Sequence, residues 1–196
     1  IKAYEMASTL QHVKILGIDC HIGSQISESK PFEDALYNIL SLASQLKQKG
    51  IEISCLDMGG GLGITYQGES PPEPTDYARA IQKILKPTNY RLILEPGRVI
   101  VGNAGALITR VLYRKSGKDK EFVITDAGMN DLIRPSLYQA FHAIQPVMRH
   151  KGHPITADVV GPICESGDFL ALDRELPDVQ KGDLLAVMSA GAYGFV

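Results

Sequence analysis

The first half of the chain alternates short apolar runs with longer amphipathic segments. Three apolar runs predict buried strands, at 13–21, 51–58 and 91–95. Between them, residues 31–49 predict a helix with Pro31 in its first turn and Gly50 just past its end, and residues 76–85 predict a second helix. The strand centres are about 37 residues apart, which is enough for a βαβ unit of about 30 residues. We therefore expect a parallel sheet here.

Each predicted strand ends in a polar or glycine-rich turn, and these are His21–Ser24, Asp57–Gly61 and Glu95–Arg98. Chemistry at the carboxyl ends of parallel strands is typical of a TIM barrel or a doubly wound sheet. Three units cannot close an eight-stranded barrel, so we expect the remaining strands upstream. The spacing of Met6, Leu10 and Val13 predicts that the chain opens inside a helix, and it closes in an apolar run. We expect residues to be missing at both ends.

The pattern changes after about Asn103. Four segments are strand-like, at 106–113, 121–125, 154–160 and 183–188, whereas only 132–141 is helical in pattern. We expect two domains, with limits 1–103 and 104–196, and the second should be rich in β-structure.

Composition excludes several classes of protein. The 196 residues are 44% hydrophobic and 21% charged with a formal net charge of −2, as in an ordinary globular protein. There is no long basic run for nucleic acid, no apolar stretch long enough for a bilayer, and no signal peptide. The three cysteines form no CxxC pair, which argues against a disulfide framework or zinc site and favours a reducing cytoplasm. We expect no metal.

Two turns carry candidate anion-binding groups. Backbone N–H groups of Gly59, Gly60 and Gly61 can close on an anion, although three glycines also make an ordinary tight turn. The Ser24 hydroxyl can bind phosphate or cap a turn, and the His21 ring can stack on an aromatic cofactor or be a buried, hydrogen-bonded histidine.

The turn Glu95-Pro96-Gly97-Arg98 can place opposite charges in one cleft. A carboxylate can hold a proton on a pyridine nitrogen, and a guanidinium binds phosphate or carboxylate. The alternative is an exposed ion pair of little energetic value.

The second half adds two candidates. Cys164 lies in a loop with Glu165 and Asp168, where carboxylates favour the neutral thiol and so a proton donor; the alternative is an idle small residue. Arg134 and Tyr138 are four residues apart, so on a helix they share a face and can clamp a substrate carboxylate, or form only a surface cation–aromatic contact.

The order of these motifs is more specific than any one of them. HIGSQ, DMGGG, EPGR, DAGMNDLIRPSLY, GPICESGD and AGAYG together closely resemble the fold-type III decarboxylases that depend on pyridoxal 5'-phosphate, whose barrel is similar to that of alanine racemase. The resemblance runs from about Val13 to Val196. Three features favour the diaminopimelate branch over the ornithine branch, namely RPSLY at 134–138, CESGD at 164–168, and Gln25.

The resemblance implies a fold, in which residues 1–103 are the C-terminal part of a (β/α)8 barrel and 104–196 a Greek-key or sandwich-like β-domain. It also implies site residues. His21 would stack on the cofactor ring and Glu95 would pair with its nitrogen. The phosphate would be held by a larger set: Ser24, Gly59, Gly60, Gly61, Gly97 and Arg98.

Substrate contacts are implied for Arg98, Arg134, Tyr138 and Glu165, and Tyr193 would touch cofactor or substrate. Cys164 would return a proton after CO2 leaves, to a carbanion that the protonated ring delocalises. The family places this cysteine loop in the partner subunit's site, which implies a homodimer. The expected reaction is decarboxylation of meso-2,6-diaminopimelate to L-lysine by the full-length parent.

One departure concerns the family's Schiff-base lysine, which lies upstream of HIGSQ. Lys2 and Lys14 precede that motif too closely, so we expect this segment alone to be inactive. Three alternatives stay open. They are a related decarboxylase acting on ornithine, arginine or carboxynorspermidine, a non-catalytic homologue that binds a partner protein, and a phosphate-binding barrel without the cofactor.

Overall fold

The computed structural model describes residues 1–149 and 153–195. The chain forms two compact units, one of Ile1–Ile64 with Ser70–Val99 and the other of Thr65–Glu69 with Ile100–Val196. Val196, where the predicted second domain ends, lies outside the described residues. Each unit is described by itself below.

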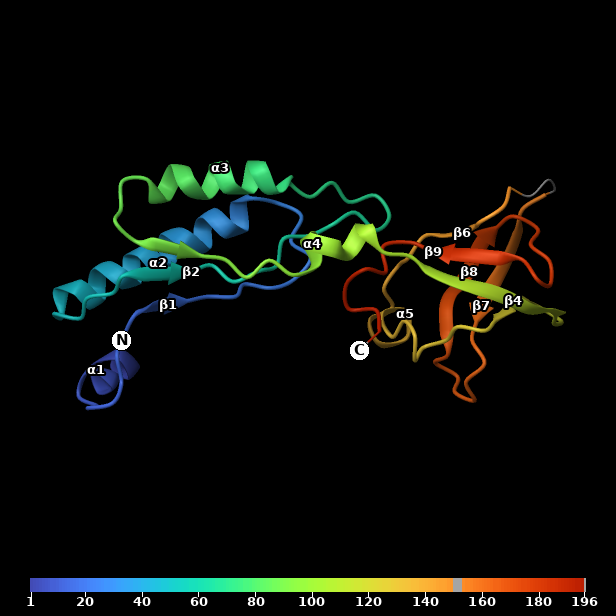
Figure 1. Ribbon diagram of the computed structural model, residues 1–196, viewed down its shortest axis with the longest axis horizontal. Coiled ribbons are helices and arrows are strands. Elements are labelled where there is room, and N and C mark those ends of the chain that lie inside the picture. Colours follow the sequence, from blue (N-terminus) through green and yellow to red (C-terminus); the bar gives the residue numbers. More distant parts are fainter. Residues whose placement is uncertain (150–152, 196) are drawn as a thin grey trace. The chain divides into compact units, whose positions relative to one another are not determined.

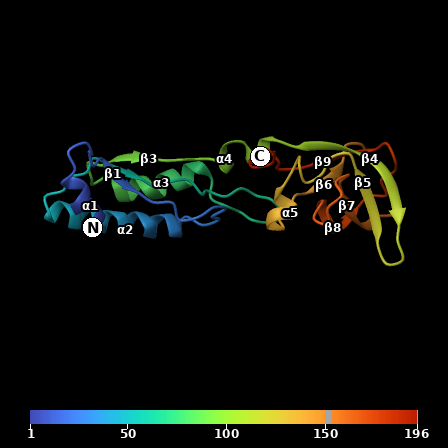
Figure 2. The same ribbon diagram turned by 90° about the horizontal axis from the view of Figure 1, so that it is seen from below.

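A three-stranded parallel sheet organises the first unit. Its strands are β1 (Gly17–Asp19), β2 (Cys55–Asp57) and β3 (Arg91–Ile93), in that order, with Asp19 opposite Asp57 and Asp57 opposite Ile93. The helices α2 (Lys30–Gln48) and α3 (Pro74–Leu85) lie side by side on one face of this sheet (Figures 1 and 2). The predicted parallel sheet alternating with helices is therefore confirmed.

Helix α2 shows why the sequence folds in this way. Pro31 occupies its first turn, and Gly50 follows its end with a φ of 76°, a conformation that costs glycine little. Leu36 and Leu46 are fully buried on its inner face, and Phe32 meets Tyr77 of α3 edge-to-face with ring centroids 4.8 Å apart. The core of this unit is therefore closed between the two helices and the sheet.

Several elements of this unit are shorter than their apolar runs predict. The predicted strands at 13–21, 51–58 and 91–95 are each paired over only three residues, and Val13 and Leu16 are about half exposed. An apolar run indicates burial, but strand length depends on how many residues find a backbone partner. The first helix, α1 (Lys2–Ser8), likewise ends before Leu10 and Val13.

A short helix, α4 (Arg98–Val101), and a 3-10 turn, η1 (Gly102–Ala104), follow β3. No helix within residues 1–149 and 153–195 has the length and apolar character that crossing a membrane requires.

The second unit contains a six-stranded mixed sheet in the order β6-β9-β4-β5-β7-β8. Its strands are β4 (Leu107–Ser116), β5 (Glu121–Thr125), β6 (Ile144–Pro146), β7 (Ile155–Val160), β8 (Phe169–Leu176) and β9 (Leu184–Val187). Strands β4 and β5 form a long antiparallel hairpin (Figure 2), while β5 and β7 are parallel.

Strand β4 is shared between two halves of this sheet. Residues 107–110 pair with β9, and residues 111–116 pair with β5 after a register shift near Val111. The expected β-rich character of this part of the chain is confirmed, in the form of a mixed six-stranded sheet. Val111, Val123, Val159 and Leu185 form its fully buried core.

Two strands and one helix end of this unit differ from prediction. Helix α5 (Arg134–Tyr138) covers half of the predicted 132–141, because Gln139 takes a left-handed φ of 52° and ends it. Strands β6 and β8 were not predicted, since Pro146 and the charged run at 173–175 interrupt the apolar alternation.

Candidate functional site

In the first unit, the loops after β1 and β2 are joined to one another. Ile26 bridges Leu62: the Ile26 N–H donates to the Gly61 carbonyl at 2.9 Å, and the Gly63 N–H donates to the Ile26 carbonyl at 3.0 Å. We call residues 20–26 and 59–64, joined in this way, the paired loops. They make one structure at the carboxyl edge of the sheet, where chemistry was predicted.

Only glycine fits at positions 60 and 61 in the second of the paired loops. A Cβ atom on Gly60 would lie 2.3 Å from the Glu95 carbonyl oxygen, and one on Gly61 would lie 2.2 Å from the Gly23 carbonyl oxygen. Gly61 also has a φ of 99°, in the region that favours glycine. The contact with Glu95 brings the turn after β3 against the paired loops.

The backbone N–H groups of the three glycines do different tasks, which corrects the expectation that all three close on an anion. The Gly59 N–H donates to Oδ1 of Asp57 at 2.9 Å, and the Gly60 N–H donates to Nδ1 of His21 at 3.3 Å. The N–H groups of Gly61 and Leu62 make no hydrogen bond within the described part of the chain. In the glycine loop, these two donors are available to an anion.

Two further predicted residues of this unit come together, Ser24 on a loop and Arg98 at the first position of α4. Nη2 of Arg98 donates to Oγ of Ser24 at 3.1 Å, although 74 positions separate them in the sequence. A hydroxyl beside a guanidinium is a suitable donor set for a phosphate. His21 accepts at Nδ1, so its neutral ring carries its proton on Nε2.

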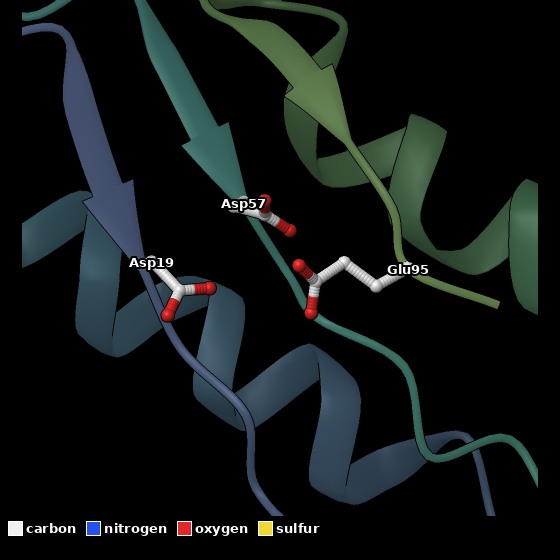
Figure 3. A group of neighbouring side chains, drawn as sticks. All are labelled: Asp19, Asp57 and Glu95. Carbon is white, nitrogen blue, oxygen red and sulfur yellow. The ribbon is translucent and has the colours of Figure 1, made fainter. Parts of the chain in front are cut away.

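Three carboxylates gather at the ends of β1, β2 and β3, and we call Asp19, Asp57 and Glu95 the acidic trio. Figure 3 shows their side chains directed toward one another, and their ligand oxygens lie within 4.8 Å of each other. The Glu95 N–H donates to the Gly59 carbonyl at 2.8 Å, which fixes this turn beside the paired loops. Three neighbouring carboxylates would stabilise a protonated pyridine nitrogen placed beside them.

Sequence reasoning identified Glu95 but gave Asp19 and Asp57 no role. The signal was present, because each is the last residue of a parallel strand and such ends meet at one edge. Burial, and then the charges of Asp19 and Asp57, raise the pKa of the Cys20 thiol. Cys20 is therefore a thiol at neutral pH.

In the second unit, Arg134 is held inside the protein. Its side chain is 8% exposed, its guanidinium carbon lies 4.5 Å from the ring centroid of Tyr66, and Nη1 lies 2.7 Å from Nε2 of His142. Because a guanidinium only donates, Nε2 of His142 accepts and Nδ1 donates to the Met188 carbonyl at 2.8 Å. This fixes one neutral tautomer of a fully buried histidine that sequence reasoning missed.

Tyr138 differs from Arg134, although both lie on α5. Tyr138 is 69% exposed whereas Arg134 is buried, so the two side chains lie in different environments. Tyr193 is half-exposed and has a left-handed φ of 55°.

Cys164 lies in an exposed loop, as predicted, but its neighbour Asp168 has another task. Asp168 is 4% exposed; Oδ1 accepts from the Met129 N–H and Oδ2 from the Ile163 N–H, both at 2.6 Å. The expected influence of Asp168 on the thiol is therefore replaced by a structural role at the base of the loop. Glu165 accepts from the Gly167 N–H at 3.2 Å.

Residues 34–191 match the family described as the pyridoxal-dependent decarboxylase, C-terminal sheet domain. Diaminopimelate decarboxylases of Aquifex aeolicus and Pseudomonas aeruginosa are each 54% identical to the chain, over 99% and 98% of it and 46% of their own length. A crystal structure of diaminopimelate decarboxylase from Helicobacter pylori complexed with L-lysine has a TM-score of 0.89 and 41% identity, covering 98% of this chain and 49% of that one. The chain thus spans about half the length of the relatives it matches.

Proposed function

The chain belongs to the pyridoxal-dependent decarboxylase family, and we propose that its parent protein converts meso-2,6-diaminopimelate to L-lysine and CO2. The observation that carries the chemistry is the paired loops with the acidic trio beside them. The choice of substrate follows the relatives, which are diaminopimelate decarboxylases at 50–54% identity.

We assign residues 1–103 to the C-terminal part of a (β/α)8 barrel and residues 104–196 to a C-terminal β-domain. The parallel strands β1, β2 and β3 support the first assignment, since each carries its polar turn at its carboxyl end. The other strands of such a barrel would be supplied by the rest of the parent.

The residues of the first unit fit pyridoxal 5'-phosphate. The phosphate would be bound by the N–H groups of Gly61 and Leu62, the Ser24 hydroxyl and Arg98, and Gly59, Gly60 and Gly97 would let the backbone approach. Leu62 joins the predicted set, because its N–H, like that of Gly61, makes no hydrogen bond within the described residues. When bound, the cofactor supplies an electron sink, which takes up the electron pair that remains when CO2 departs.

The acidic trio would act on the opposite end of the cofactor. Glu95 would hold a proton on the ring nitrogen, and the charges of Asp19 and Asp57 would favour that protonated form. His21 would lie against the ring, oriented by its hydrogen bond from Gly60.

Diaminopimelate carries a second amino-acid end, so its selection requires a cation for the distal carboxylate and an anion for the distal ammonium. We assign the first task to Arg98 and Arg134, with Tyr138, and the second to Glu165. Cys164 would donate the proton that replaces CO2, and Tyr193 would contact cofactor or substrate. We propose a homodimer in the cytoplasm, in which the loop of Cys164 serves the partner's site.

The test is CO2 release by the full-length parent with pyridoxal phosphate, offered diaminopimelate, ornithine, arginine and carboxynorspermidine in parallel. We expect diaminopimelate to give the highest kcat/KM by at least tenfold, because only it engages both distal charges. A parent that prefers ornithine would overturn the roles of Arg134 and Glu165. A parent that binds no pyridoxal phosphate would point instead to a non-catalytic homologue.

A further inference from the structure

The side chain of Gln25 joins the paired loops by two hydrogen bonds. Its Nε2 donates to the Ile64 carbonyl at 2.5 Å, and the Ile64 N–H donates to its Oε1 at 3.2 Å. The amide therefore pairs with the main chain of Ile64 as a neighbouring strand would, across 39 positions of sequence. Because the Ile64 N–H can only donate and its carbonyl only accept, both orientation and chemistry of the amide are specified.

The backbone of Gln25 shows that this side chain is retained at a cost. Its φ is 59°, in the left-handed region, where glycine is at no disadvantage and a residue with a side chain is strained. Gly63 lies close to this residue, since a Cβ there would be 3.3 Å from the backbone carbonyl carbon and 3.4 Å from Cδ of Gln25. A strained residue with two specific bonds over a glycine indicates that the side chain does something glycine would not.

The groups that Gln25 joins are the anion donors. Ser24 is the residue before it. The Leu62 N–H lies between the two Ile26 bonds, which are made at the Gly61 carbonyl and the Gly63 N–H, the Gly61 N–H comes just before them, and the Ile64 bonds follow directly. Without the amide, the paired loops keep the two backbone bonds of Ile26 and the bond from Gly60 to His21, but Gln25, the neighbour of Ser24, makes no side-chain bond to the second loop. The Ser24 hydroxyl is then less firmly held relative to the two N–H groups.

We propose that Gln25 is a positioning residue of the phosphate site: it holds the two loops in one geometry and so sets how strongly the protein prefers a phosphorylated ring to an unphosphorylated one. This inference rests on the proposed function. It differs from a general stabilising role, because it concerns the phosphate end of the ligand and not the ring.

The test compares dissociation constants of pyridoxal phosphate and of pyridoxal for the cofactor-free, full-length parent, measured by absorbance titration. The variant Gln25→Met keeps the length of the side chain and removes both bonds, and Gln25→Glu keeps the acceptor but cannot donate to the Ile64 carbonyl. Gln48→Met is the matched control, because Gln48 lies exposed near the end of α2.

We expect Gln25→Met to raise the dissociation constant of pyridoxal phosphate about tenfold, which is equivalent to about 1.4 kcal/mol of binding free energy. The dissociation constant of pyridoxal should rise less than twofold. Gln25→Glu should act in the same direction, and the control should change neither. Equal weakening of both ligands, or of neither, would overturn the proposal.

A further variant separates positioning from folding. Gln25→Gly relieves the backbone strain, so it should fold even if Gln25→Met does not, yet it should show the same loss of phosphate preference. A Gln25→Gly protein with the wild-type preference would overturn the proposal. A wild-type parent that fails to bind pyridoxal phosphate would refute the proposed function instead.

Discussion

Gly60→Ala is the sharpest structural test of the paired loops and their contact with Glu95. Gly60 is not in the left-handed region, so alanine is tolerated by its backbone and only the new methyl group matters. That Cβ would lie 2.3 Å from the Glu95 carbonyl oxygen, whereas ordinary contact begins at 3.4 Å. The glycine loop and the turn after β3 must therefore separate by about 1 Å.

The cost can be estimated from this contact. The neighbour is a backbone oxygen that cannot rotate away, so the change resembles overpacking of a closed core, at about 1–3 kcal/mol. The same movement displaces Glu95 relative to the phosphate donors, so the affinity for pyridoxal phosphate should fall as well. Gly68→Ala is the control, because nothing lies within 4 Å of its Cβ position.

The assay is urea unfolding of the full-length parent, followed by titration with pyridoxal phosphate. Gly60→Ala should lose about 1–3 kcal/mol and bind the cofactor at least tenfold more weakly, while Gly68→Ala should stay within about 0.5 kcal/mol. If the two variants behaved alike, the inference that Gly60 packs closely against Glu95 would be refuted.

Three further predictions address other parts of the chain. Asp168→Asn replaces one acceptor of two backbone N–H groups with an amide donor, so urea unfolding should show a loss of about 1–3 kcal/mol; equality with the exposed Asp119→Asn would contradict the buried role. The Gln67 N–H, with those of Tyr66 and Gly68, lowers the pKa of Glu69 from 4.5 to about 2. The stability that the Glu69 carboxylate contributes is therefore present above pH 4.5 and is lost as the pH falls toward 2. The difference in urea midpoint between wild type and Glu69→Gln should shrink across that window, and a constant difference would refute this prediction. Borohydride reduction of the loaded parent should attach the cofactor to a lysine outside these 196 residues, and a labelled peptide containing Lys2 or Lys14 would show that expectation to be mistaken.

Much of the first unit was predictable because its signals are local. Pro31 and Gly50 delimit α2, and the apolar spacing inside it sets the buried face, so the helix was predicted within one residue at each end. The three turns with chemistry follow from the strands that precede them. Strand lengths were overestimated, since pairing depends on partners that no local pattern reveals.

The second unit was less predictable because its features depend on contacts distant in sequence. Strand β8 carries Asp173, Arg174 and Glu175 in succession, so no apolar alternation marks it, and only pairing with β7 makes it a strand. Arg134 has the pattern of a surface residue on a short helix, yet His142 and Tyr66 bury it.

The site shows the same division. The motif order predicted which turns matter, but it assigned all three glycine N–H groups to the anion, whereas Asp57 and His21 take two of them. Nor does composition reveal that Asp19 and Asp57 join Glu95, because that requires the register of β1 against β2.

A crystal structure of the full-length parent with pyridoxal phosphate would test the account most directly. We predict that the phosphate accepts hydrogen bonds from the Gly61 and Leu62 N–H groups and the Ser24 hydroxyl, with a Glu95 carboxylate oxygen at the ring nitrogen. A phosphate bound elsewhere, with the paired loops and the acidic trio away from the cofactor, would contradict it.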